Sequence, residues 1–162
     1  MDYTVRNAKP NDLQRIEAIY AYARSFMAQN GNPTQWGTCE PPYETLVNDI
    51  EENNLFVIES NDQIHGVFYF HIGEDSTYQT IYDGSWRSET PYGTIHRIAG
   101  GGSGGILRTA VTFAEKQIDH IRIDTHHDNH IMQQALRKLG FDKRGIIYIA
   151  DGSARIAYDR LV

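Results

Sequence analysis

The stretch that decides the fold runs from Thr94-Ile95-His96-Arg97-Ile98-Ala99 through Gly100-Gly101-Gly102-Ser103-Gly104-Gly105 to the helix-like segment 106–118. Glycine is a poor residue for the interior of a helix or strand, so the cluster predicts a loop whose backbone amides stay free. The apolar residues before it predict a strand, and those after it follow the spacing of an amphipathic helix. A helix that starts directly after such a loop adds partial positive charge. The unit therefore predicts a cradle for an anion, most plausibly a phosphate group.

A flexible linker is the alternative interpretation of the glycine cluster. Linkers are flanked by polar, unpatterned sequence, whereas this one joins a strand pattern directly to a helix pattern. The segment also lacks the Gly-Lys-Ser/Thr ending of a P-loop, a GxGxxG pattern and an acidic residue at the distance of a ribose site. These absences disfavour nucleotide hydrolysis and dinucleotide binding.

The composition favours one soluble domain spanning residues 1–162. Of the 162 residues 40% are hydrophobic and 22% are charged, and the formal net charge of −6 disfavours a nucleic-acid partner. The first residues lack a signal pattern, and no apolar run approaches the roughly 18 residues of a membrane span. We therefore expect a cytoplasmic protein without a membrane partner. Cys39 is the only cysteine, which excludes an intramolecular disulfide and a cysteine-based zinc site.

The periodicity along the chain predicts a mixed α/β fold. Strands are expected at 3–8, 55–59, 64–73, 94–99, 120–125, 143–150 and 154–159, and helices at 10–30, 43–53, 106–118 and 129–139. The segments 32–42 and 74–92 are expected to be irregular, and long loops in compact domains are often functional. This order of elements predicts a mixed sheet with helices on both faces.

A second motif lies near the C-terminus, where Asn129 is followed twelve residues later by Phe141 within Leu139-Gly140-Phe141. With the glycine loop and the order of elements, this motif resembles the GCN5-related N-acetyltransferase (GNAT) family over essentially the whole chain. The resemblance implies a GNAT-like acyl-CoA N-acyltransferase fold with a mixed, mostly antiparallel sheet. It also implies transfer of an acetyl group from acetyl-CoA to a primary amine of a small molecule or peptide by direct attack.

The resemblance further implies a set of coenzyme A contacts. In this family a backbone amide of the strand before the loop polarises the thioester carbonyl, and the loop amides bind the pyrophosphate. The corresponding cofactor-binding residues here are Ile98, Ala99, Gly102, Ser103, Gly104, Gly105, Ile106 and Asn129.

The sequence departs from the family pattern in two places. The basic residue that usually starts the loop is absent, since positions 100–105 hold only Gly and Ser. Seven residues after Asn129, where many members carry a tyrosine that protonates the departing thiolate, the chain has Leu136. Two alternatives therefore stay open: an acyl-CoA-binding module without catalysis, and a nucleotide-binding domain.

Direct attack by an amine needs a group that accepts a proton. The candidate catalytic residues are His96 on the strand before the loop, Asp124 at the end of the next strand, and Tyr148. His96 and Asp124 rank first because they would lie near the cleft. The alternatives are that His96 only hydrogen-bonds within the sheet and that Tyr148 only packs at the edge of the core.

The acceptor pocket is expected to involve aromatic residues. Trp36 lies between the first two helices, where family members often build this pocket, and Tyr69 and Tyr82 are candidates to wall it. Trp36 has an alternative role as a cover for the edge of the core. The acidic residues Glu59, Glu74 and Asp83 are candidates to attract a cationic amine.

A histidine-rich segment precedes the last predicted helix. His126, His127, Asp128 and His130 are compatible with a metal site, but a polar cluster at a helix start is commonly a cap, so we expect no metal. Exposed edge strands and the aromatic segment 74–92 are compatible with a homodimer.

Overall fold

The computed structural model describes residues 2–162 and contains one seven-stranded sheet with the strand order β1-β2-β3-β4-β5-β7-β6. The strands are β1 (Thr4–Asn7), β2 (Leu55–Ser60), β3 (Gln63–Ile72), β4 (Gly93–Gly100), β5 (His120–Thr125), β6 (Asp142–Tyr148) and β7 (Ala154–Leu161). The helices are α1 (Leu13–Gln29), α2 (Tyr43–Glu51), α3 (Ile106–Glu115) and α4 (His130–Lys138), with short 3-10 turns η1 (Pro10–Asp12) and η2 (Ser76–Tyr78). Among the strands of residues 2–162, only β4 and β5 pair in parallel. The predicted mixed, mostly antiparallel sheet is confirmed.

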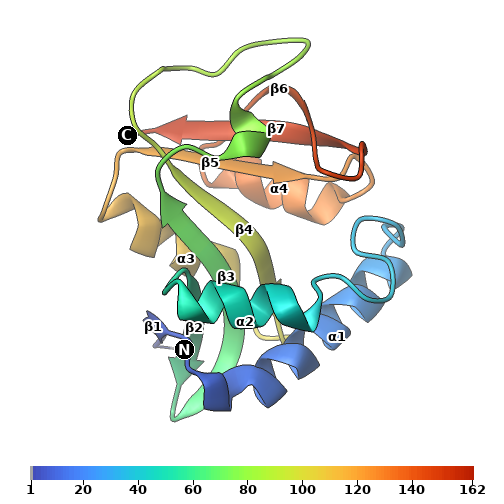
Figure 1. Ribbon diagram of the computed structural model, residues 1–162, viewed down its shortest axis with the longest axis vertical. Coiled ribbons are helices and arrows are strands. Elements are labelled where there is room, and N and C mark those ends of the chain that lie inside the picture. The colour runs from blue at the N-terminus through green and yellow to red at the C-terminus, as the bar shows by residue number, and fades with distance from the viewer. Residues whose placement is uncertain (1) are drawn as a thin grey trace.

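Helices α1 and α2 lie on one face of the sheet, and α3 and α4 lie on the other (Figure 1). Successive side chains of a strand point to opposite faces, and along β3 Val67 packs with α1 and α2 whereas Phe68 packs with α3. Both side chains are fully buried. The sheet therefore separates two hydrophobic clusters, and a site between helices of opposite faces requires an opening in the sheet.

Such an opening lies between β4 and β5. The two strands pair only at Gly93 with Ile121 and at Thr94 with Arg122, although β4 continues to Gly100 and β5 to Thr125. Their carboxyl-terminal halves thus diverge and leave backbone and side chains of both strands facing a cleft.

A β-bulge in β4 lies at the cleft. Tyr69 pairs with His96 and Val67 pairs with Ala99, so β4 holds one more residue than β3 over this interval. Arg97 has a φ of +50°, in the left-handed region that costs a residue with a side chain about 1–2 kcal/mol. The Tyr20 hydroxyl donates a hydrogen bond of 2.6 Å to the Arg97 carbonyl, and Asp49 accepts one of 3.0 Å from the Arg97 Nε. These contacts hold the strained residue.

The segment between β3 and β4 is the long loop that the sequence predicts, interrupted only by η2. It arches over the end of the sheet that carries β6 and β7 (Figure 1). Tyr78 and Tyr92 are buried there, and the Trp86 indole donates a hydrogen bond of 2.9 Å to the Tyr78 carbonyl. The loop is therefore packed onto the sheet.

No helix within residues 2–162 combines the length and the apolar character that a membrane crossing needs.

Candidate active site

Two adjoining cavities occupy the opening between β4 and β5. The first, of about 440 Å³, is lined by the diverging strands and by part of the segment 32–42, and we call it the cleft cavity. The second, of about 340 Å³, is lined by the glycine loop, α1 and α4, and we call it the loop cavity. Met27, Ile98, Asn129 and Met132 line both cavities. A ligand can therefore extend from the glycine loop to the cleft.

The loop cavity gathers nearly all of the predicted cofactor-binding residues. It is lined by Ile98, Ala99, Gly102, Ser103, Gly104, Ile106 and Asn129, and Gly105 is the one member of the set that does not line it. A Cβ atom placed on Gly104 would meet nothing within 4 Å, so the space beside this backbone is open. Tyr3 donates a hydrogen bond of 2.8 Å to the Gly104 carbonyl and thereby braces the loop.

A basic side chain lies beside the loop even though the loop contains none. The Arg15 guanidinium comes from α1, and its NH2 lies 3.2 Å from the position of a Cβ on Gly101. The glycine loop and the start of α3 make a suitable site for a pyrophosphate, and Arg15 lies beside the loop although it lines neither cavity. The sequence alone does not identify Arg15, because this α1 residue and the loop are far apart in the chain.

Asn129 begins α4. Its side-chain oxygen accepts a hydrogen bond of 3.1 Å from the Met132 amide as an N-cap, and its Nδ2 donates one of 3.1 Å to Gln35. Leu136, at the position of the family tyrosine, is fully buried in the cluster that α3 and α4 form with the sheet. It lines neither cavity.

The cleft cavity brings His96 and Asp124 together. The His96 Nε2 lies 2.8 Å from an oxygen of Asp75, and its Nδ1 lies 3.7 Å from the Asp124 Oδ2. The Tyr78 hydroxyl donates a hydrogen bond of 2.6 Å to that same Asp124 oxygen. Asp75, His96, Asp124 and Tyr78 thus form a connected row of acid–base groups, and two of them border the cavity.

The pKa values of Asp75 and Tyr78 are displaced. Burial raises the pKa of Asp75, but hydrogen bonds from His96 and Thr77 and the charge of His96 outweigh it, so that the net shift lowers the pKa. Burial, together with the neighbouring Asp124 carboxylate, raises the pKa of Tyr78 well above its usual value. Tyr78 therefore stays a neutral hydrogen-bond donor to Asp124 at neutral pH.

Trp36 lines the cleft cavity, whereas the other predicted aromatic residues, Tyr69, Tyr82 and Tyr148, line neither cavity. Trp36 packs edge-on against Tyr20, with 5.5 Å between ring centroids. Tyr69 is half-buried beneath the Arg97 guanidinium, which lies 4.5 Å from the ring centroid. Tyr82 and Tyr148 are about half exposed, pack on each other at 5.3 Å and line neither cavity. The structure thus does not bring Tyr148 to His96 and Asp124.

The acidic residues that line the cleft cavity are not the three predicted from the sequence. Glu59, Glu74 and Asp83 line neither cavity, whereas Glu40, Asp124 and Asp151 line the cleft cavity. Asp75 and Tyr78 were missed because the segment 74–92 has no periodicity from which a buried position could be identified.

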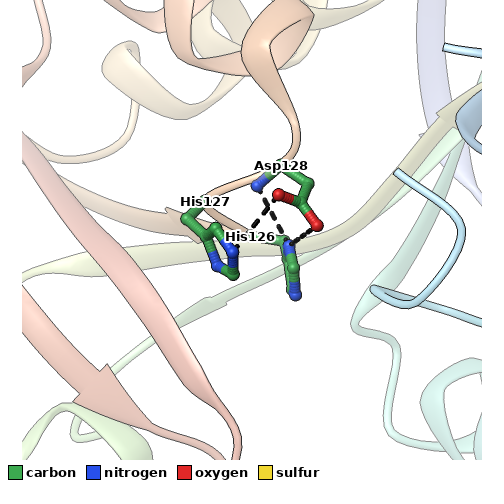
Figure 2. Close-up of side chains that lie close together, drawn as sticks. All are labelled: His126, His127 and Asp128. Atoms are coloured by element: carbon green, nitrogen blue, oxygen red, sulfur yellow. Dashed lines mark hydrogen bonds and ion pairs between the residues drawn. The ribbon is translucent and has the colours of Figure 1, made fainter. Parts of the chain in front are cut away.

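The histidine-rich segment forms a turn before α4 (Figure 2). The His126 Nδ1 accepts a hydrogen bond of 3.1 Å from the Asp128 amide, and its Nε2 lies 3.4 Å from the Thr34 hydroxyl. The exposed His127 ring stacks on His126 with 4.4 Å between centroids and lies 3.2 Å from an Asp128 oxygen. These contacts stabilise the turn, and the expectation that the chain uses no metal stays a prediction.

Solved structures share this architecture over the whole chain. A crystal structure of a GNAT-family acetyltransferase from Streptococcus agalactiae matches with a TM-score of 0.89 and 26% sequence identity, covering 99% of this chain and 95% of that chain. The chain therefore has the fold of GNAT-family acetyltransferases. The relationship supports acetyl transfer, with an acyl-CoA as donor, as the general class of reaction.

More distant GNAT structures share the fold. An acetyltransferase from Listeria monocytogenes matches with a TM-score of 0.72 at 18% identity, covering 99% of this chain and 95% of that chain. A ribosomal-protein-alanine N-acetyltransferase from Brucella melitensis matches with a TM-score of 0.63 at 16% identity, covering 98% and 99%. No protein-family model matches the sequence, and no curated protein matches it.

Proposed function

We propose that this protein transfers an acetyl group from acetyl-CoA to a primary amine that binds in the cleft cavity. The observation that carries the proposal is the pair His96 and Asp124 in the cleft cavity, which adjoins the loop cavity. Acetyl-CoA supplies an activated acetyl thioester. The residues of the chain orient the thioester, provide charged groups around it and accept the proton that the amine releases.

Asp124 is the group proposed to receive the amine. An acidic side chain in a cavity attracts an ammonium ion, and Asp124, with the His96 Nδ1 3.7 Å away, is placed to accept the proton that the nitrogen releases. Asp75 fixes the orientation of the His96 ring through its 2.8 Å contact with the Nε2.

The bulge in β4 is proposed to orient the thioester. A bulge leaves backbone groups outside the ladder, so the amide of Ile98 is a candidate to donate a hydrogen bond to the carbonyl oxygen. The glycine loop and Arg15 are proposed to bind the pyrophosphate, which holds the ligand in a fixed register.

Replacement of the acid–base pair tests the proposal. Wild-type protein incubated with acetyl-CoA and a pool of primary amines, both small molecules and peptides, is expected to yield an acetylated amine detectable by mass spectrometry. Asp124→Asn should lower the rate by roughly 10²- to 10⁴-fold, the usual contribution of an acid–base group, while acetyl-CoA still binds. Glu17→Gln, an exposed change on α1, is the matched control and should leave the rate unchanged.

The non-catalytic module predicts a different outcome. In that case acetyl-CoA binds to the wild-type protein but no amine of the pool is acetylated above the background rate. The burial of Leu136 gives this alternative no added support, because a side chain that lines neither cavity does not close the site.

A further inference from the structure

Arg155 on β7 is a buried cation that faces the cleft cavity. Only 6% of the residue is exposed, and it lines the cavity that also holds Asp124. Its guanidinium donates hydrogen bonds to neutral oxygens only: the Gln35 carbonyl at 3.2 Å, the Ala154 carbonyl at 3.0 Å and the Ser153 hydroxyl at 3.2 Å.

No carboxylate within residues 2–162 pairs directly with Arg155, since the ion pairs of the arginines involve Arg6, Arg87, Arg97, Arg144 and Arg160. Asp151 reaches it only through the Ser153 hydroxyl. Burying an unpaired charge is costly, and buried charges in proteins are normally paired. The buried guanidinium of Arg155 therefore has no anionic partner in direct contact among the described residues.

Arg97 and Arg122, on the neighbouring strands, have other surroundings than Arg155, although the buried Arg122 Nε has no hydrogen-bond partner. Arg97 has Asp49 at 2.8 Å, and the Arg122 guanidinium lies between the rings of Trp86 and Tyr92 at 4.1 and 3.8 Å from their centroids. Arg155 differs from both because its unpaired charge borders an open cavity.

The register of the sheet places this cation relative to Asp124. Asp124 on β5 pairs with Ala157 on β7, and Arg155 lies two residues before Ala157, so its side chain leaves the same face of the sheet. Such diagonal neighbours in a sheet are roughly 7–8 Å apart. Asp124 and Arg155 therefore lie on neighbouring strands, and both line the cleft cavity.

We propose that the acceptor is an amino acid, in which the amine binds at Asp124 and the carboxylate of the same molecule binds at Arg155. The two N–H groups of a guanidinium can bind the two oxygens of a carboxylate, and one carboxylate balances the unpaired charge of Arg155. The inference rests on the proposed function, because it assigns the substrate class of the same cavity.

Binding measurements test the role of Arg155 without requiring turnover. Isothermal titration calorimetry of the coenzyme A-saturated protein compares the standard L-amino acids with their amides, which keep the amine and lose the negative charge. At least one amino acid should bind roughly 10- to 100-fold more tightly than its amide, the effect expected of one hydrogen-bonded charge pair. Arg155→Gln should abolish this preference, whereas Arg160→Gln, on the same strand but paired with Glu115, should keep it.

Equal binding of amino acids and amides by the wild-type protein, or no binding of any amino acid, would overturn the proposal. This comparison needs no variant, so it holds even if Arg155→Gln fails to fold. The proposed function fails separately. If amino acids bind through Arg155 but no amine is acetylated, the proposed acetyl transfer is wrong and the proposed role of Arg155 is kept. If amides are acetylated as fast as amino acids, acetyl transfer is kept and the proposed role of Arg155 is wrong.

Discussion

At the scale of single residues, Arg97 connects the fold to the chemistry. Its left-handed backbone creates the bulge that turns β4 at the cleft, and a non-glycine residue adopts this conformation only when neighbours compensate for the strain. Tyr20 and Asp49 provide that compensation from α1 and α2. The orientation of the Ile98 amide thus depends on helices on one face of the sheet.

Replacing Tyr20 with Phe should separate positioning from ligand binding. The change removes the hydrogen bond to the Arg97 carbonyl and leaves this acceptor without its partner, at a cost of about 1–3 kcal/mol in the free energy of unfolding. We expect a rate of acetyl transfer lower by an order of magnitude, with little change in affinity for acetyl-CoA. Urea unfolding and steady-state kinetics check both effects, with Tyr43→Phe, at an exposed position, as the control. An unchanged rate would show that the bulge does not orient the thioester.

The lowered pKa of Asp75 predicts that this residue contributes to the free energy of unfolding in a pH-dependent way. Its pKa in the folded protein lies below the unfolded value of about 3.9, so Asp75 contributes stability above about pH 4 that is lost as the pH falls further. Asp75→Asn should therefore be less stable than wild type at neutral pH, and the difference should shrink in acid. Urea unfolding at about pH 6 and about pH 3 measures it. A difference that is constant or grows in acid would contradict the assignment of the His96 contact.

Residue roles were predictable from the sequence only where a motif or a strand end marked them. His96 and Asp124 end or precede recognisable segments, and the structure brings both to one cavity. Asp75 lies in an irregular segment. Arg155 is important because it is the diagonal neighbour of Asp124 on the adjacent strand. Such relationships depend on register, which the sequence alone does not give.

At the scale of elements, the strand β4, the glycine loop and α3 form the unit that holds the ligand. The predicted helix at 106–118 ends at Glu115, but Ile118 still packs against the core as a partly buried residue. Ile118 is therefore apolar because it packs against the core after the helix has ended, not because the helix extends to it. The strand at 120–125 agrees with the sequence to the residue, because its apolar alternation is bounded by polar turns on both sides.

Gly104→Val tests the loop. Gly104 has an ordinary φ and open space around it, so valine should be tolerated by the fold but should fill the site proposed for the pyrophosphate. We expect at least roughly tenfold weaker binding of acetyl-CoA with a small change in stability. Calorimetry and thermal unfolding provide the two readouts.

Gly152→Ala is the matched control for the loop. Gly152 has a φ of +86° in the turn between β6 and β7 and nothing within 4 Å, so alanine should lower stability by about 1 kcal/mol through strain alone. Its affinity for acetyl-CoA should stay that of wild type. If Gly104→Val binds acetyl-CoA normally, the loop does not cradle the ligand.

At the scale of the whole molecule, the site exists because the sheet divides. The order of elements and the mixed sheet follow from periodicity, so they were predictable. The point at which β4 and β5 separate was not, since it depends on pairing between segments that are remote in sequence. The central claim is that this opening is one continuous site for an acyl-CoA, with the nucleotide end in the loop cavity and the thioester in the cleft.

Thermal unfolding with acetyl-CoA, coenzyme A, ATP and NAD in parallel tests that claim most directly. A ligand at about 100 times its dissociation constant adds roughly 2.7 kcal/mol, which for a chain of this length raises the unfolding midpoint by roughly 5–10 °C. The account predicts this rise with acetyl-CoA and coenzyme A and none with ATP or NAD. A comparable rise with ATP or NAD, or no rise with either coenzyme A compound, would contradict it.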